Sequence, residues 1–234
     1  MPMEKSATRI GVRRRGLQVI GTLALQGLVL LGSAGTWHWT MAWLVLAIDL
    51  LSILGSAVVM MRRAPELVAE RSRVAADAKA WDRPLAGIVS LFGPLTTWIV
   101  AGLDRRLAGA DALPVGLQAG ALAAMAIGYA GWAWAMTSNP FFAGLVRIQH
   151  ERGHHVVTDG PYQVVRHPGY AAMIVFTLAK AVALGSTWAL LPATVTAAVA
   201  VVRTVMEDRA LQQELAGYQE YARQVRYRLL PGVW

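Results

Sequence analysis

The chain contains several apolar segments long enough to cross a lipid bilayer as helices, and this feature limits its possible folds most strongly. A membrane-spanning helix needs about 20 mostly apolar residues. Four such segments lie in the first 136 residues: Leu17 to Thr36, Trp39 to Met61, Leu85 to Leu103 and Leu113 to Met136. A single charge, Asp49, interrupts the second segment.

A fifth apolar region, Tyr170 to Val202, is too long for one crossing. Gly185 and Ser186 lie near its middle, and Pro192 follows, so we expect two helices joined by a tight turn near Gly185. The first of them contains Lys180. The chain is thus predicted to be all-α, a polytopic integral membrane helical bundle of about six spans, or of five if the last pair forms a shorter re-entrant hairpin.

Composition agrees with lipid as the solvent. Only 15% of the residues are charged and 56% are hydrophobic, whereas soluble domains have about 25% charged residues. The absence of cysteine excludes disulfides, thiolate metal sites and a cysteine nucleophile. The net charge is +8, but the basic residues flank apolar runs instead of sharing one helix face with aromatic residues, so we expect no nucleic-acid partner.

The basic residues are distributed unequally between the two ends of the spans. They cluster before the first span, after the second, after the fourth and after the last, whereas the opposite side has only Arg105 and Arg106. Cytoplasmic loops carry the excess of Lys and Arg. We therefore expect both termini and Thr137 to His167 on the cytoplasmic side. The N-terminal segment resembles a signal peptide, but we interpret it as a first transmembrane helix.

The basic loop from Arg62 to Pro84 has a mixed-charge sequence that permits a helix. Leu67, Val68, Val74 and Trp81 would form an apolar stripe on it. An amphipathic helix at the membrane interface and a solvated linker both fit this pattern.

Polar residues concentrate in the segment that follows the fourth span. Four of the five histidines lie between His150 and His167. A zinc site of the HExxH type needs Glu between its two histidines, whereas Glu151 directly follows His150. We therefore expect no metal; solvated loop histidines and a nucleotide-like ligand site are the remaining interpretations.

A second polar group ends the last apolar helix. Arg203 and Glu207 are four residues apart and share one helix face. In isolation this pattern indicates a helix-end salt bridge. Asp208 points about 100° away from Glu207 and is expected to face water.

Several short motifs occur together in the C-terminal part. They are Gly160-Pro161-Tyr162, Arg166-His167-Pro168-Gly169-Tyr170, Glu207-Asp208-Arg209-Ala210-Leu211, and then Tyr218, Tyr221 and Pro231. In this order they resemble the isoprenylcysteine carboxyl methyltransferase family, and in part the related phospholipid N-methyltransferases. The resemblance covers Ser138 to Trp234 and divides the chain into a four-helix region, 1–136, and a methyltransferase core, 137–234. Asp208 stands where a second Glu is common.

The resemblance implies S-adenosyl-L-methionine as cofactor. Residues implied to bind it are Gln149, His154, His155, Val156, Val157, Tyr162, His167, Pro168, Gly169, Tyr170 and Glu207. Arg203 is implied to face the methyl acceptor, and Arg203 and Glu207 are the candidate catalytic residues. These residue types suit the cofactor, because Glu207 can accept hydrogen bonds from its ammonium group or its ribose hydroxyls, and the tyrosine rings can face its sulfonium.

Methyl transfer to a carboxylate needs no general base, because the acceptor is already ionised. Arg203 suits such an anion, so a lipophilic carboxylate, such as that of a prenylated cysteine, is the expected acceptor. A lipophilic acceptor would enter between helices from the membrane lipids. Alternatives are a phospholipid amine, or a small isoprenoid or thiol acceptor. A membrane reductase matches the motifs less well, and a non-catalytic scaffold or small transporter would be a different class.

Overall fold

The computed structural model describes residues 21–63, 77–109 and 112–234. Within these ranges it contains helices and no strand. The longer elements are the helix Gly21–Ala34, α2 (Thr40–Arg63), α4 (Asp82–Gly87), the π-helical turn η1 (Ile88–Phe92), α5 (Gly93–Ala108), α6 (Val115–Ser138), α7 (Pro168–Ala183), α8 (Leu190–Glu214) and α9 (Tyr218–Gln224). Two 3₁₀ turns, η2 (His150–Arg152) and η3 (Gly160–Gln163), lie between α6 and α7.

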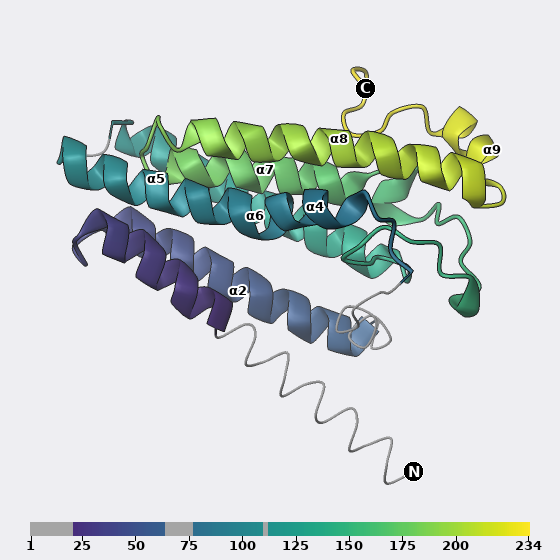
Figure 1. The fold of residues 1–234 in the computed structure, drawn as a ribbon, viewed down its shortest axis with the longest axis horizontal. Coiled ribbons are helices and arrows are strands. Elements are labelled where there is room, and N and C mark those ends of the chain that lie inside the picture. The colour runs from purple at the N-terminus through teal and green to yellow at the C-terminus, as the bar shows by residue number, and fades with distance from the viewer. Residues whose placement is uncertain (1–20, 64–76, 110–111) are drawn as a thin grey trace, which may run out of the picture.

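The long helices lie side by side along the long axis of the molecule (Figure 1). α6 packs most extensively on α7, α7 packs on α8, and α5 packs on α8. α2 and the helix Gly21–Ala34 form a layer along one side of this group (Figure 1). The loops between α6 and α7, the end of α8 and α9 all gather at one end of the bundle (Figure 1).

The chain is a polytopic helical membrane protein. Four helices are long and apolar enough to cross a bilayer: Thr40–Arg62, Asp82–Ala108, Val115–Ser138 and Leu190–Glu214. Gly21–Ala34 and Pro168–Ala183 are shorter apolar helices. Over the residues that the structure describes, all six predicted segments therefore form helices. α7 has 16 residues and is therefore about 24 Å long, shorter than the bilayer's hydrocarbon core of about 30 Å. Whether the chain crosses the membrane five or six times therefore depends on whether α7 spans it.

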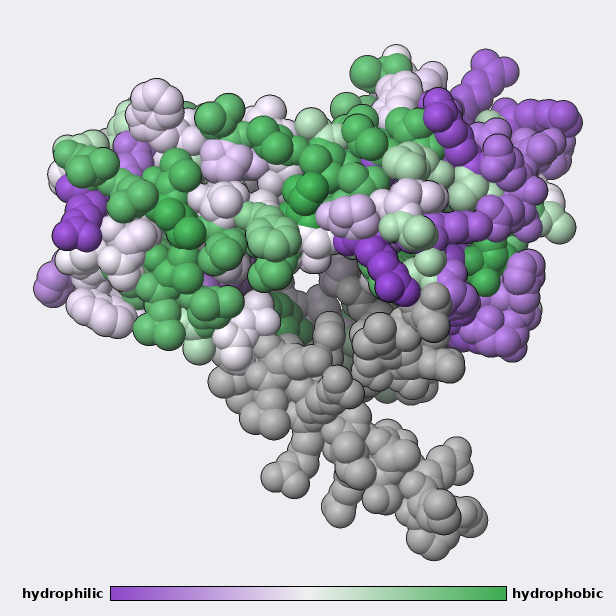
Figure 2. Space-filling view, viewed as in Figure 1, coloured by the Kyte–Doolittle hydropathy of each residue, from purple (hydrophilic) through white to green (hydrophobic). Residues whose placement is uncertain are grey.

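The distribution of apolar side chains on the surface is the one expected of a protein embedded in lipid. Figure 2 shows hydrophobic residues along much of the helical bundle and hydrophilic residues gathered at the end with α9 and the loops. Leu28, Leu51, Ile127 and Leu191 are each at least 65% exposed. A soluble protein would rarely expose so many large apolar side chains together, whereas a bilayer would cover them.

Small residues let these helices approach closely. A Cβ added at Gly128 on α6 would lie 3.1 Å from the Ala172 backbone and from Phe176 on α7. A Cβ at Gly93 on α5 would lie 2.1 Å from Thr196 Oγ1 on α8. Without a hydrophobic driving force between helices in lipid, such close backbone packing is a main source of association.

The predicted turn between the last two apolar helices is confirmed. Gly185 adopts φ 70°, a left-handed conformation that glycine reaches without steric cost. The Ser186 hydroxyl then accepts a hydrogen bond from the Ala189 amide at 3.0 Å and donates one to Asp104 at 2.5 Å. These contacts tie the turn to the end of α5.

Most of the loop predicted as an interfacial helix or a linker lies outside the described residues. The part that is described, from Asp77 onward, leads directly into α4.

Candidate functional site

One cavity of about 510 Å³ connects the polar end of the bundle with its interior. Its polar end is lined by the α6–α7 loop, the start of α7, the end of α8 and α9. Its inner part is lined by residues of Gly21–Ala34, α2, α5, α6 and α7. The spans before residue 136 therefore contribute a large part of the cavity wall.

The structure brings together most of the side chains that the sequence suggested. His154, His155, Val156, Val157, Tyr162, His167, Gly169, Tyr170, Arg203 and Glu207 all line the cavity. Gln149 and Pro168 are buried beside it and are not part of its lining.

Gln149 organises the loop on which the cavity wall is built. Its Nε2 donates to the Phe141 carbonyl at 2.7 Å, and its Oε1 accepts from Arg152 at 2.5 Å. Its backbone amide donates to His154 Nδ1 at 3.2 Å. The residue thus fixes the positions of Phe141 and His154.

His154 stacks on Phe141 with ring centroids 4.4 Å apart. Burial of the ring, followed by the charges of His155 and His150, lowers the pKa of His154 to about 4. His154 is therefore neutral at pH 7 and leaves Nε2–H as a donor, because Nδ1 accepts from Gln149.

The next residues, Val156 and Val157, run between the two 3₁₀ turns without regular structure. Their backbone groups form no backbone hydrogen bond within the described ranges. Backbone amide and carbonyl groups without such a partner can pair with a planar ligand such as a purine.

Among the described residues, Glu207 has one hydrogen-bond partner, the Tyr170 hydroxyl, which donates to Oε2 at 2.6 Å. Among the described residues it forms no ion pair, although it is half-buried at the cavity wall. Each basic side chain of the cavity lining other than histidine is paired: Lys180 with Asp49, Arg147 with Asp77, Arg166 with Asp208 and Arg203 with Asp82. Glu207 is thus the carboxylate that a cationic ligand would find available.

Arg203 forms a bidentate ion pair with Asp82, the first residue of α4. Its Nε lies 2.6 Å from Oδ1 and its Nη2 lies 2.9 Å from Oδ2 of that carboxylate. Nη2 also donates to the Gly144 carbonyl at 2.8 Å. The guanidinium lies over the Tyr170 ring, 5.5 Å from its centroid. Nη1 has no hydrogen-bond partner in the ranges that the structure describes. The partner is therefore Asp82, and not Glu207 as the helix-end salt bridge would require.

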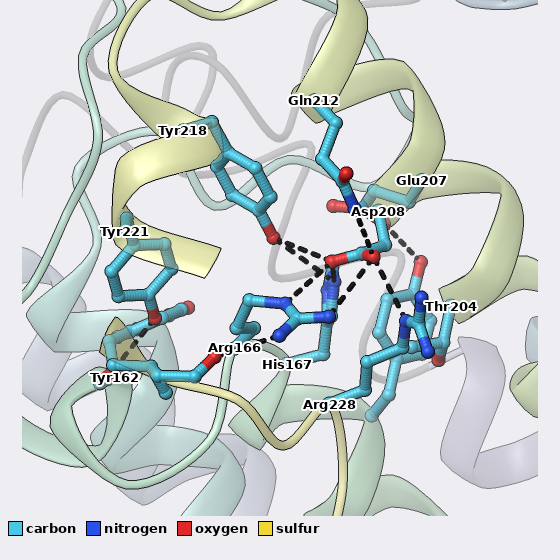
Figure 3. Close-up of polar contacts among 12 residues, drawn as sticks. Tyr162, Arg166, His167, Thr204, Glu207, Asp208, Gln212, Tyr218, Tyr221 and Arg228 are labelled. Atoms are coloured by element: carbon cyan, nitrogen blue, oxygen red, sulfur yellow. Dashed lines mark hydrogen bonds and ion pairs between the residues drawn. The ribbon is translucent and has the colours of Figure 1, made fainter. Parts of the chain in front are cut away.

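Asp208 does not face water, so that expectation was wrong. Its carboxylate is fully buried and accepts from Arg166, His167, Tyr218, Gln212 and Arg228 (Figure 3). The α6–α7 loop and the C-terminal tail fold over this side of α8 and exclude water, which the helix angle alone does not reveal. We call Asp208, Arg166, His167, Tyr218 and Arg228 the tail cluster.

Hydrogen bonds within the tail cluster decide which atoms of its side chains can still contact a ligand. His167 Nε2 lies 3.2 Å from Asp208 Oδ1, so Nδ1 is the nitrogen left for a ligand. Burial, and then the Asp208 charge, raises the pKa of Tyr218 above its usual value, which keeps its hydroxyl a neutral donor. Tyr221, one turn later, donates to the Tyr162 carbonyl at 2.7 Å.

Tyr162 contributes its ring to the cavity and uses its hydroxyl in the wall. The hydroxyl donates to the Ala135 carbonyl and accepts from Asn139, both at 3.3 Å. Burial raises the pKa of Tyr162 above its usual value, so it does not serve as a proton-transfer group near neutral pH.

Two contributors were missed at the sequence level. Phe141 was not singled out, although an aromatic pair after Asn139-Pro140 is unusual in a polar loop. Asp82 lies directly before an apolar span, and that position was the available signal. In the described ranges, no group of three His, Asp or Glu side chains converges as metal ligands do.

Comparison with known proteins finds a match over the segment that contains the candidate site. Residues 121–213 match the model of the isoprenylcysteine carboxyl methyltransferase family. This segment belongs to that family. It includes α6 from Ala121, the α6–α7 loop, α7 and nearly all of α8, and therefore every residue in the predicted site. The tail motifs Tyr218, Tyr221 and Pro231 lie beyond it.

A curated relative agrees with the family assignment. Protein-S-isoprenylcysteine O-methyltransferase B of Arabidopsis thaliana is 35% identical over 49 residues, which are 21% of this chain and 25% of the relative. The matched segment thus spans about a quarter of the relative's length.

Proposed function

We propose that the protein is an S-adenosyl-L-methionine-dependent methyltransferase that acts on a lipophilic acceptor. The observation that carries this proposal is Glu207: a half-buried carboxylate without a cationic partner among the described residues, at the wall of a cavity that connects the polar end with the apolar interior. The family of residues 121–213 supports the reaction type.

The lining suits the chemical groups of this cofactor. Glu207 would accept from the ammonium or the ribose hydroxyls, and the open backbone edge at Val156 and Val157 would pair with the adenine. Tyr170 would present an electron-rich ring to the sulfonium. The cavity volume also lies in the range of small-molecule sites, about 300–1,000 Å³.

The first turn of α7 would receive the cofactor carboxylate, next to His167, whose Nε2 is held by Asp208. Pro168 begins α7, and amides at a helix N-terminus favour an anion. Gly169 has Phe142 within 3 Å of the position of a Cβ, so the backbone and that ring are in close contact here. Gln149 and Pro168 would act by shaping the loop and the helix start.

When bound, the cofactor supplies a methyl group that a nucleophile can accept directly. The residues of this chain then need to align the acceptor with the methyl group and exclude water. Arg203, fixed by Asp82 and Gly144, would offer Nη1 to an acceptor oxygen. A lipophilic carboxylate such as that of a prenylated cysteine fits this donor and needs no base.

The active site is proposed to face the cytoplasm. The basic residues near the ends of the spans favour this orientation, and the cofactor-facing loops, the end of α8 and α9 share one end of the bundle (Figure 1). The cofactor would enter from that side, and the acceptor from the membrane lipids.

Calorimetry with S-adenosylhomocysteine tests the role of Glu207. Glu207→Gln keeps the shape and removes the charge, and we expect its affinity to fall about 10- to 100-fold, as for loss of a hydrogen bond to a charged group. Glu214→Gln is the matched control on the same helix, because Glu214 is exposed and pairs with Lys79. Wild-type affinity in the Glu207 variant would refute the cofactor assignment.

A further inference from the structure

The inner end of the cavity is closed by a polar cluster inside the membrane region. Asp49 on α2 pairs with Lys180 on α7, whose Nζ lies 2.9 Å and 2.8 Å from its two carboxylate oxygens. Tyr129 on α6 donates to Asp49 Oδ1 at 2.5 Å, and its oxygen lies 3.2 Å from Lys180 Nζ. We call Asp49, Tyr129 and Lys180 the floor cluster.

The three residues of the floor cluster have few unused hydrogen-bonding positions. Lys180 directs its three donors to Asp49 Oδ1, Asp49 Oδ2 and Tyr129. Asp49 accepts additionally from Tyr129 and from Gln26 Nε2. Lys180 Nζ also lies 5.8 Å from the Trp98 and Tyr129 ring centroids. The cluster therefore makes little demand for a polar ligand and behaves as a fixed wall.

The cavity ends at this level on all three helices. One turn toward the polar end, Ile53, Trp132 and Thr177 line it. One turn the other way, Val45, Met125 and Leu184 are at most 1% exposed, belong to one apolar core and are not part of the lining. Nothing in the lining lies beyond the floor cluster on α2, α6 or α7.

Between the two ends, one face of α7 forms an apolar stretch of wall. Tyr170, Met173, Phe176 and Thr177 follow at helical spacing and line the cavity before Lys180. Tyr170 and Lys180 are ten residues apart, so the floor lies about 15 Å along the helix from the proposed methyl-transfer site. The cavity therefore ends at a fixed distance from the proposed methyl-transfer site.

We propose that the floor cluster limits the length of the apolar tail that an acceptor can carry. An apolar floor could yield to a longer tail by changing rotamers. Displacing Asp49 or Lys180 would instead break charge-assisted hydrogen bonds in a low-dielectric interior, where an unpaired charge is strongly unfavourable. This selection by tail length rests on the proposed methyltransferase function and adds a specificity determinant to it.

The test measures methyl transfer to three S-prenylcysteine acceptors that differ only in the tail: geranyl, farnesyl and geranylgeranyl. The double variant Asp49→Ala/Lys180→Ala removes both charges together and deepens the cavity. We expect its ratio of kcat/KM for geranylgeranyl over geranyl to rise on the order of tenfold relative to wild type, the scale at which hydrophobic pockets discriminate chain length.

Two further variants separate depth from charge and from stability. Thr177→Leu keeps the floor cluster and fills the cavity one turn above it, and should lower the same ratio. Asp49→Leu/Lys180→Met removes the charges but retains the volume, and should keep the wild-type ratio. S-adenosylhomocysteine affinity reports whether each variant is folded; if the alanine pair fails that check, Thr177→Leu decides.

If the ratio of kcat/KM for geranylgeranyl over geranyl is unchanged in both the alanine pair and Thr177→Leu, the floor proposal is wrong, and the methyltransferase proposal remains intact. A ratio in the Leu/Met control that shifts as far as in the alanine pair would also overturn it, because depth would then not be the cause. Wild-type protein that methylates none of the three acceptors and does not bind S-adenosylhomocysteine would overturn the methyltransferase function, and the floor proposal with it.

Discussion

Three carboxylates around α8 have different partners, and these partners distinguish their roles. Within the described part of the chain, Asp82 binds Arg203 in a bidentate ion pair, Asp208 accepts from five side chains, and Glu207 accepts from Tyr170 alone. The first two therefore stabilise the structure. The third has capacity left for a ligand, as the cofactor proposal requires.

The Asp82–Arg203 ion pair predicts that substitutions at these two positions have non-additive effects on the free energy of unfolding. Asp82→Leu or Arg203→Met alone leaves a buried charge without its partner, and each should destabilise the fold by about 3–5 kcal/mol. The double variant removes both charges and should be less destabilised than the sum of the two. Denaturant unfolding of the four proteins in detergent measures this coupling, and additive effects would contradict the pairing.

Arg203 also predicts a separation of binding from turnover. The Asp82→Leu/Arg203→Met protein should bind S-adenosylhomocysteine with near wild-type affinity, because neither side chain is assigned to the cofactor. It should lose turnover with a carboxylate acceptor, because Nη1 is gone. Calorimetry and a methyl-transfer assay on the same preparation test both points. Retained turnover would show that Arg203 does not position the acceptor.

His154 predicts a pH dependence of stability with a defined sign. Its pKa is about 4 in the folded protein and about 6.5 in an unfolded chain. The contribution of the neutral ring is complete above about pH 6.5 and is lost as the pH falls toward 4. Melting temperatures at pH 7.5 and 5 should thus differ less in His154→Asn than in wild type. The exposed His150→Asn is the control and should retain the wild-type difference.

At the scale of helices, apolar run length sufficed to find every long element. The predicted turn near Gly185 is also where α7 gives way to α8. What run length could not reveal is which helices pack together, because that depends on small residues such as Gly128 and Gly93 meeting a partner helix. The pairing of Asp82 with Arg203 joins residues 121 positions apart for the same reason.

The fold of the loop and the tail was least accessible from the sequence. Asp208 was expected to face water on helical geometry alone, yet Arg166 and Arg228 converge on it from the loop and the tail. Arg166 and His167 donate their amides to the Tyr227 and Arg228 carbonyls, each at 2.9 Å. Such tertiary contacts leave no periodic pattern in a sequence.

The tail cluster predicts that Asp208→Asn loosens the C-terminal tail. The amide keeps the shape but loses the negative charge that neutralises Arg166 and Arg228, so the segment after Val225 should become more accessible. Limited proteolysis should then cleave at Arg226 or Arg228 at least several-fold faster than in wild type. Gln212→Ala removes one neutral donor to the same carboxylate and should change the rate less. Equal rates in all three proteins would contradict the role of the cluster.

For the whole molecule, the main feature is the cavity that the N-terminal spans and the family-matched segment line together. Its outer wall is polar, its inner wall is apolar, and the floor cluster closes it. The sequence predicted ten of its lining residues through resemblance, but it left open whether the first four spans are scaffolding or shape the acceptor tunnel. The structure places Asp49, Asp82 and Trp98 of those spans in or directly behind the wall.

The most direct test of the account is transfer of a radiolabelled methyl group from S-adenosyl-L-methionine by the purified protein in lipid. Total lipid extract and a prenylcysteine analogue are offered as separate acceptors, with Glu207→Gln as the matched control. We expect label to enter an organic-extractable product with wild-type protein, most strongly with the prenylcysteine, and to be greatly reduced with the variant. Absence of transfer to either acceptor, in a protein that is folded by its melting curve, would contradict the assignment as a lipophilic-acceptor methyltransferase.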